Sequence, residues 1–128
     1  MTPQAKGKSQ EYRVVWYLRK LGLKAERIPV SGTSRGFKGD VIAPPYLIEV
    51  KRRNEHFNPF SLRWQTFLKG VFDDIKHKAG TQFEPLAILS FKGCRIVLTE
   101  HPNYGKPYLW LYGFYVQRLE DFEFKKGA

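Results

Sequence analysis

Three ionisable side chains that could take part in catalysis or metal binding occur within one short segment, KGDVIAPPYLIEVKRR, residues 38–53. They are Asp40, Glu49 and Lys51. The segment is apolar on both sides of Pro44-Pro45, and proline interrupts a strand because it donates no backbone hydrogen bond. This pattern predicts a strand, a tight turn and a second strand beside the first. Because side chains alternate between faces along a strand, Glu49 and Lys51 should share one face and approach Asp40.

Two carboxylates that converge on one point repel each other unless a cation lies between them, and oxygen ligands of this kind suit Mg²⁺, with Mn²⁺ as a substitute. We therefore expect Asp40 and Glu49 to be metal ligands, together with the carbonyl of Val50 and with Glu11 acting through water. Lys51 would orient a water molecule or stabilise charge on a phosphoryl oxygen. The alternative is that these residues form an ordinary solvated strand face.

The composition favours a basic, globular protein of one domain, residues 1–128. Lys and Arg number 22 against 12 Asp and Glu, a net charge of +10, and such a surface most often binds nucleic acid. The hydrophobic content of 42% excludes a disordered chain. The apolar runs are too short for a membrane-spanning helix and no signal peptide is recognisable, so we expect a cytoplasmic, DNA-associated protein that does not bind membranes.

Several other kinds of chemistry lack support. Cys94 is the single cysteine, which excludes an intrachain disulfide and a thiolate metal site. The three histidines have no metal-ligand spacing and form no recognisable catalytic triad. The phosphate-binding pattern GxxxxGK[ST] does not occur, so we expect no nucleotide cofactor.

The N-terminal part predicts a polar, flexible arm over residues 1–8, followed by a helix from Ser9, a typical cap, to Gly22. The helix carries an apolar stripe of Val14, Val15, Leu18 and Leu21. Glu11 falls on the same stripe, where a buried carboxylate needs a partner. Either it points toward the metal ligands, or it is an acid of the first turn that the helix dipole favours.

A short strand is expected over residues 24–30, followed by the loop SGTSRGFKG, residues 31–39. Its backbone amides and hydroxyls, with Arg35 and Lys38, suit a phosphate, although many loops of this composition are only connectors.

A second helix is expected from Ser61 to Gly80, with an apolar stripe of Trp64, Phe67, Leu68, Val71, Phe72 and Ile75. Arg63 and Gln65, in its first turns, either contact a phosphate or belong to a solvated face.

The C-terminal part predicts a hairpin of strands 86–91 and 94–99, joined at Lys92-Gly93. The aromatic segment 108–116 reads as a further strand, with Gly113 at a bulge or bend. It offers more apolar surface than a small sheet needs, which suits a subunit interface, base stacking or plain core. The tail after residue 116 should contain a short helical turn.

The predicted order of helix, strand, strand, strand, helix and strand, with these acids and the E-V-K of the third strand, resembles the PD-(D/E)XK nuclease core, a restriction-endonuclease-like α/β fold with a mixed sheet flanked by helices. Within that superfamily the chain resembles the archaeal-type Holliday junction resolvases, a family also found in viruses and phages. The motifs that carry this resemblance are KGKSQE, IPVSGTSRG, GDVIA, YLIEVKRR and RWQ, and they span the first two thirds of the chain.

The resemblance implies a homodimeric, Mg²⁺-dependent endonuclease of DNA recombination and repair, which cuts two opposing strands of a four-way junction. By position, Glu11, Asp40 and Glu49 match the acids of the family and Lys51 its lysine. Ser31 matches a loop serine and Gln65 a helix glutamine. The expected phosphate contacts are Lys6, Lys8, Arg13, Arg35, Lys38, Arg52, Arg53, Arg63 and Gln65.

Two departures from the family pattern concern the substrate more than the chemistry. Gly39 stands where a proline usually precedes the first strand acid, and the turn between Asp40 and Glu49 is short. Two alternative functions therefore remain open. One is another structure-selective or restriction-type endonuclease of the superfamily, and the other is a DNA-binding module that has this fold without catalysis.

Overall fold

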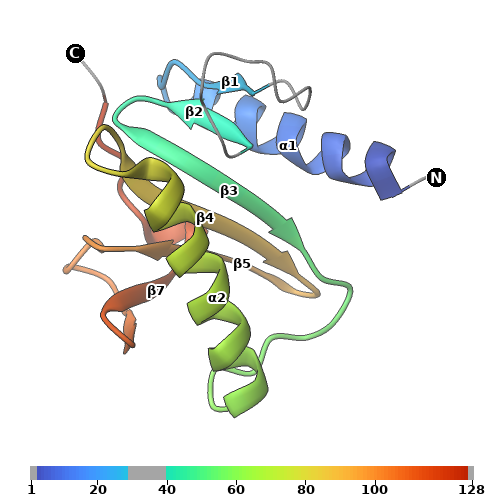
Figure 1. Cartoon of the computed structure of the whole chain (residues 1–128), viewed down its shortest axis with the longest axis vertical. Helices are drawn as coiled ribbons and strands as arrows, with labels where there is room; N and C mark the ends of the chain where they lie inside the picture. Colours follow the sequence, from blue (N-terminus) through green and yellow to red (C-terminus); the bar gives the residue numbers. More distant parts are fainter. Residues whose placement is uncertain (1–2, 29–39, 127–128) are drawn as a thin grey trace.

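The protein folds around one sheet of seven strands, accompanied by two long helices (Figure 1). The structure is a computed structural model that describes residues 3–28 and 40–126, and the side chains of residues 9–28 and 40–126. Its elements in chain order are α1 (Pro3–Lys20), β1 (Glu26–Arg27), β2 (Val41–Ala43), β3 (Tyr46–Arg52), α2 (Leu62–Ala79), β4 (Glu84–Phe91), β5 (Cys94–Thr99), β6 (Leu109–Leu111), β7 (Phe114–Arg118) and the 3-10 turn η1 (Leu119–Asp121).

The strand order in the sheet is β1-β2-β3-β4-β5-β7-β6. The pair β3 and β4 is parallel and is connected through α2, and the other pairs are antiparallel. The predicted order of helix, strand, strand, strand, helix and strand is confirmed, as is a mixed α/β sheet flanked by helices. Among the residues that the structure describes, no helix is long and apolar enough to span a membrane.

Side-chain alternation along the central strands creates two separate hydrophobic cores. Leu47 and Leu89 pack with the apolar stripe of α2, on what we call the α2 face of the sheet. Ile48 and Ile88 pack with the apolar stripe of α1, on what we call the α1 face. Because successive strand residues point to opposite faces, these cores also decide where the polar residues at the end of β3 project.

The turn between β2 and β3 follows the prediction from Pro44-Pro45. The two strands are antiparallel, with Val41 opposite Ile48 and Ala43 opposite Tyr46, and the Pro44-Pro45 peptide bond is cis. The tight reversal leaves the residues on either side of the turn paired.

The first helix begins earlier than predicted, whereas the prediction that Gly22 lies just past its end is confirmed. It begins at Pro3, so residues 3–8, which were expected to form an arm, are helical, and Ser9 lies inside the helix rather than at its cap. A proline suits the first helical position because its fixed φ is helical and its missing N–H needs no partner there. At the other end Gly22 has a φ of +91°, and the N–H of Leu23 donates to the carbonyl of Leu18 at 3.0 Å, a Schellman closure. The helix therefore ends before Leu21, which is exposed, so its predicted place on the buried stripe is wrong.

The second helix and the hairpin that follows agree with the sequence. Ser61 and Gly80 flank α2, and its predicted stripe is buried apart from Phe67, which is partly buried. The strands β4 and β5 meet at Lys92-Gly93.

The segment 108–116, however, is two strands rather than one. Tyr112 and Gly113 both have positive φ, +47° and +88°, so they turn the chain back on itself between β6 and β7.

Several aromatic side chains of this C-terminal hairpin and of the loop before it are exposed, which excludes the plain core alternative for them. They are Tyr104, Tyr108, Trp110 and Tyr112. The predicted short helical turn of the tail is η1.

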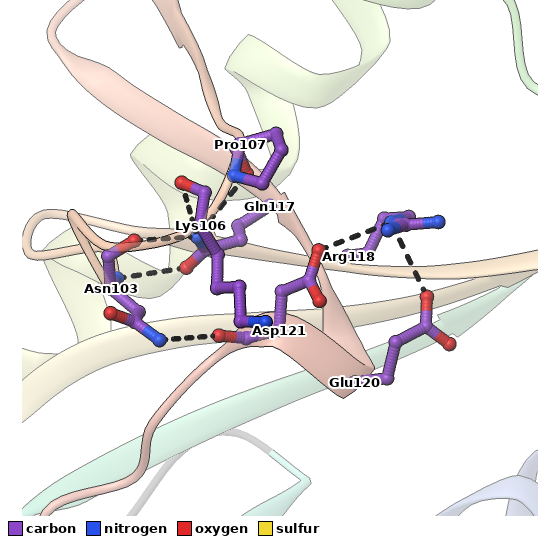
Figure 2. Close-up of polar contacts among 7 residues, drawn as sticks. All are labelled: Asn103, Lys106, Pro107, Gln117, Arg118, Glu120 and Asp121. Atoms are coloured by element: carbon purple, nitrogen blue, oxygen red, sulfur yellow. Dashed lines mark hydrogen bonds and ion pairs between the residues drawn. The ribbon is translucent and has the colours of Figure 1, made fainter.

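One buried side chain, Gln117, anchors the loop before β6 (Figure 2). Its Oε1 accepts a hydrogen bond from the N–H of Asn103 at 2.8 Å, and its Nε2 donates to the carbonyl of Asn103 at 2.8 Å and to that of Pro107 at 3.2 Å. The side chain of Asn103 in turn donates to the carbonyl of Asp121 at 2.9 Å. A single residue of β7 therefore determines the course of the loop.

Candidate active site

The structure brings the carboxyl groups of Asp40 and Glu49 together on the α2 face. Asp40 precedes β2, and its backbone N–H donates to the carbonyl of Ile48 at 3.1 Å. Its Oδ2 accepts a hydrogen bond from the N–H of Val50 at 2.8 Å. The side chain of Glu49 hydrogen-bonds to Asp40 and is only 5% exposed. The predicted convergence of these two carboxyl groups is confirmed.

The environment of Glu49 strongly disfavours its charge. Burial, and then the hydrogen bond and the negative charge of Asp40, raise the pKa of Glu49 to about 7, against opposing effects of Lys78 and Lys51. A carboxyl group with such a pKa is protonated below about pH 7, and a bound cation would favour its ionised form. A raised pKa of this kind is typical of two neighbouring carboxyl groups whose negative charge a cation would compensate.

A lysine of α2 supplies part of the compensation. The Nζ of Lys78 lies 3.5 Å from Oε1 of Glu49 and 2.9 Å from Oδ2 of Asp74. Burial lowers the pKa of Lys78, but the hydrogen bond to Asp74 and the charges of both acids outweigh it, so the pKa is raised above its ordinary value. Lys78 therefore stays charged and links the carboxyl pair to the helix.

A groove of about 370 Å³ opens beside Glu49, between β3 and α2. Three charged residues line it from the side of β3, namely Glu49, Lys51 and Arg53, and it is completed from α2 by Thr66, Phe67, Gly70, Val71 and Asp74. A side chain in place of Gly70 would meet open space, and the guanidinium of Arg53 lies 4.7 Å from the ring centre of Phe67. The groove thus combines two cations, Lys51 and Arg53, with two acids, Glu49 and Asp74. The cations suit contacts with phosphates.

The donor set fits a hard divalent cation. Asp40 and Glu49 offer carboxylate oxygens, and the raised pKa of Glu49 marks a site that gains from a bound positive charge. Across residues 3–28 and 40–126, no three His, Cys, Asp or Glu side chains are grouped so that they could hold a metal ion. The site that the structure describes is therefore built on two carboxylates.

Glu11 is not part of this group. Its Oε1 accepts from Nε of Arg27 at 2.7 Å, and its side chain is 12% exposed. The prediction that it points inward with the stripe of α1 is confirmed, but α1 packs on the face of the sheet opposite Glu49. The expectation that Glu11 joins Asp40 and Glu49 is not supported by this geometry, because Arg27 provides its positive partner.

The predicted DNA contacts are divided between the two faces. Arg53 lines the groove beside Glu49, as does the predicted catalytic Lys51, whereas Arg52 lies with Arg13 in a separate cavity on the α1 face. Alternation along the strand explains the division.

Two predicted contacts on α2 are held by neighbouring residues. Arg63 pairs with Glu55 at 3.2 Å, and Gln65 donates to the carbonyl of Pro59 at 2.9 Å. Neither lines the groove beside Glu49. Ser31, Arg35 and Lys38 lie outside the described residues, as do the side chains of Lys6 and Lys8.

The contributions of α2 to the site escaped the sequence analysis. Asp74 and Lys78 stand four residues apart, a spacing that indicates an ion pair on a helix. Neither residue was predicted to belong to the site. Only the packing of α2 across β3 reveals that the pair faces Glu49.

Comparisons with known proteins give a structural similarity, but none at the level of sequence. No family model matches the chain, and no curated protein matches its sequence. The chain is similar to the solved structure of Hjc from Archaeoglobus fulgidus, described as a Holliday junction resolvase from an archaeal hyperthermophile. The identity is 17%, the match covers 90% of each chain and the TM-score is 0.45.

Proposed function

We propose that the protein is a Mg²⁺-dependent endodeoxyribonuclease that resolves four-way DNA junctions as a homodimer. The observation that carries this proposal is the pair of carboxyl groups of the partly buried Asp40 and the buried Glu49. Glu49 lines a groove together with Lys51 and Arg53. The net charge of +10 supports a polyanionic substrate. The choice of a junction among DNA substrates is supported by the resolvase-like motifs of the sequence.

In the proposed mechanism Asp40 and Glu49 would hold the ion, with the carbonyl of Val50 as a further expected oxygen. When bound, a divalent ion supplies Lewis-acid activation of a phosphate and a more acidic water. Lys51 orients the attacking water or stabilises charge on the phosphoryl oxygen, and Arg53 positions the DNA backbone. Lys78 keeps Glu49 partly compensated before the ion enters. The expected products carry a 5′-phosphate and a 3′-hydroxyl.

Symmetric cutting requires a second copy of the chain. Two opposing strands of a junction are cut at equivalent positions only if two active sites are related by a two-fold axis. We therefore propose a homodimer, which analytical ultracentrifugation at micromolar concentration tests directly. A protein that remains a monomer with and without junction DNA would contradict symmetric resolution.

The decisive experiment compares a synthetic immobile four-way junction with a linear duplex of the same arm sequence, each with Mg²⁺ and with EDTA. We expect paired nicks on opposing strands of the junction in Mg²⁺ alone. Asp40→Asn should abolish cleavage and leave binding equal or tighter, because a negative charge beside DNA is removed while an oxygen remains to accept the N–H of Val50. Glu55→Gln, which changes an exposed acid, is the matched control.

Each other outcome selects a different function. Equal cutting of duplex and junction would identify another endonuclease of the same fold. Tight metal-independent binding without cutting would identify a binding module. Full cleavage by the Asp40→Asn variant would refute the assignment of the site.

A further inference from the structure

A second groove runs along α1, on the face of the sheet opposite Glu49. It consists of two adjoining cavities of about 230 Å³ and 510 Å³, which share Arg13, Tyr17 and Arg95. Arg52 and Ser90 line the first, at the ends of β3 and β4, and the second continues along the helix past Trp16 to Lys20. We call the two cavities together the α1 groove.

The α1 groove is strongly positive. Its charged lining residues are Arg13, Lys20, Arg52 and Arg95, and no Asp or Glu lines it. Within the described part of the chain, none of these four cations forms an ion pair with a carboxylate. Elsewhere the cations Arg27, Arg63 and Arg118 do have acidic partners. Four uncompensated cations around one hollow favour a polyanion as the occupant.

The same groove exposes aromatic rings. Tyr12 and Trp16 stand one helical turn apart and are 51% and 61% exposed. Arginines hold the rings in place: Arg27 lies 5.3 Å from the ring centre of Tyr12, and Arg95 lies 5.3 Å from that of Tyr17. Rings that are exposed, oriented and interleaved with cations have the composition of a stacking platform for bases.

We propose that the α1 groove binds single-stranded DNA, with bases stacked on Trp16 and Tyr12 and phosphates bound by Arg13, Arg95 and Arg52. A duplex offers mainly its backbone to such a surface, because the faces of its bases are already stacked, whereas an unpaired strand offers both bases and phosphates. The selection of DNA rests on the proposed function. The binding itself needs neither the carboxyl pair nor a metal.

The α1 groove lies close to the groove beside Glu49, so single-strand binding there could contribute to the recognition of branched DNA. Arg52 belongs to the α1 groove and Arg53 to the groove beside Glu49, so the two grooves approach each other at the end of β3. A strand that separates from its complement at a branch point can enter the α1 groove while the paired arm lies across the other face. The α1 groove would then favour DNA with unpaired nucleotides at the branch.

The test measures the Kd of fluorescein-labelled oligothymidylate, about 15 nucleotides long, by fluorescence anisotropy in EDTA, beside a blunt duplex of the same length. Trp16→Ala should raise the Kd for the single strand about ten-fold, since stacking on an aromatic ring contributes on this scale. Arg95→Ala should raise it by a similar factor, because it removes a phosphate contact and the cation beside Tyr17. Trp16→Ala should leave the Kd for the duplex within about two-fold.

Two control variants make the result specific. Trp110→Ala removes a tryptophan of equal exposure, 62%, from the hairpin of β6 and β7, and Arg118→Ala removes an arginine that already has acidic partners. Both should retain the wild-type Kd for the single strand. Urea denaturation of each variant verifies the fold, and the exposed Arg95 provides a second variant if Trp16→Ala is unstable.

An unchanged Kd in Trp16→Ala and Arg95→Ala would overturn the inference, and so would an equal loss in Trp110→Ala, which would place stacking on the C-terminal hairpin instead. Because the assay contains EDTA, it is independent of cleavage. If the wild type cuts junctions but Trp16→Ala binds single strands normally, only the proposal for the α1 groove is refuted. If Trp16→Ala loses affinity for single strands but the wild type never cuts, only the proposed nuclease function is refuted.

Discussion

The carboxyl pair should make the free energy of unfolding depend on pH in a defined direction. The pKa of Glu49 is about 7 in the folded protein, against an ordinary value of 4.5. Because the folded value is the higher one, the folded state binds the proton more tightly than the unfolded chain. The stabilisation from this group is complete below about pH 4.5 and is lost as the pH rises through about 7. A difference of this size corresponds to roughly 3 kcal/mol.

Glu49→Gln should remove this pH dependence. Glutamine resembles the protonated glutamate in shape, stays neutral at every pH, and its amide can donate to Asp40 as the protonated acid does. Without metal at about pH 8 the variant should be more stable than the wild type by roughly 2–3 kcal/mol, whereas near pH 4.5 the two should agree. A substitution that abolishes cleavage would thus stabilise the protein.

Urea denaturation in EDTA at about pH 5 and about pH 8 measures the effect as a difference between variants, so that other titrating groups cancel. Glu55→Gln is the control, because its exposed ion pair with Arg63 should contribute less than about 1 kcal/mol at either pH. An identical stability of wild type and Glu49→Gln at about pH 8 would refute the argument that Glu49 is held at a raised pKa. Saturating Mg²⁺ should raise the stability of the wild type and leave that of Glu49→Gln nearly unchanged.

Three further predictions follow from the same contacts. Asp40→Asn should move the pKa of Glu49 down from about 7, because the variant removes a neighbouring negative charge; NMR titration of the Glu49 side chain measures this, and an unmoved pKa would contradict the coupling. Gln117→Leu should cost about 2–4 kcal/mol of unfolding free energy in urea, because it removes the partner of the N–H of Asn103 and of the carbonyls of Lys106 and Pro107, whereas the exposed Gln82→Ala should be neutral. Arg53→Ala should reduce the slope of log affinity for junction DNA against log salt by about 0.9, and an unchanged slope would exclude a phosphate contact.

The sequence alone determined the elements whose signals are local. Pro44-Pro45 between two apolar stretches specified the turn, and alternation then brought Asp40 and Glu49 to one face. The stripe of α2 and the hairpin at Lys92-Gly93 followed from helical spacing and turn chemistry. These features depend on residues within a few positions of one another.

Some local signals were nevertheless outweighed. Ser9 looked like a cap, but the residues before it extend the helix to Pro3. Gly113 indicated a bulge or bend within one strand, but Tyr112 also takes a positive φ, and the two residues reverse the chain between two strands. Such outcomes depend on what the neighbouring strand or turn requires, since several local conformations have similar free energies.

Only the tertiary structure decided which distant groups meet. Glu11 forms an ion pair with Arg27 because α1 packs on the face of the sheet opposite Glu49. Lys78 forms an ion pair with Glu49 because α2 crosses β3. Arg52 and Arg53, adjacent in the chain, belong to grooves on different faces. The sequence determined which charges exist and how they alternate along each element, whereas the burial and the partner of each charge depend on how the helices pack on the sheet.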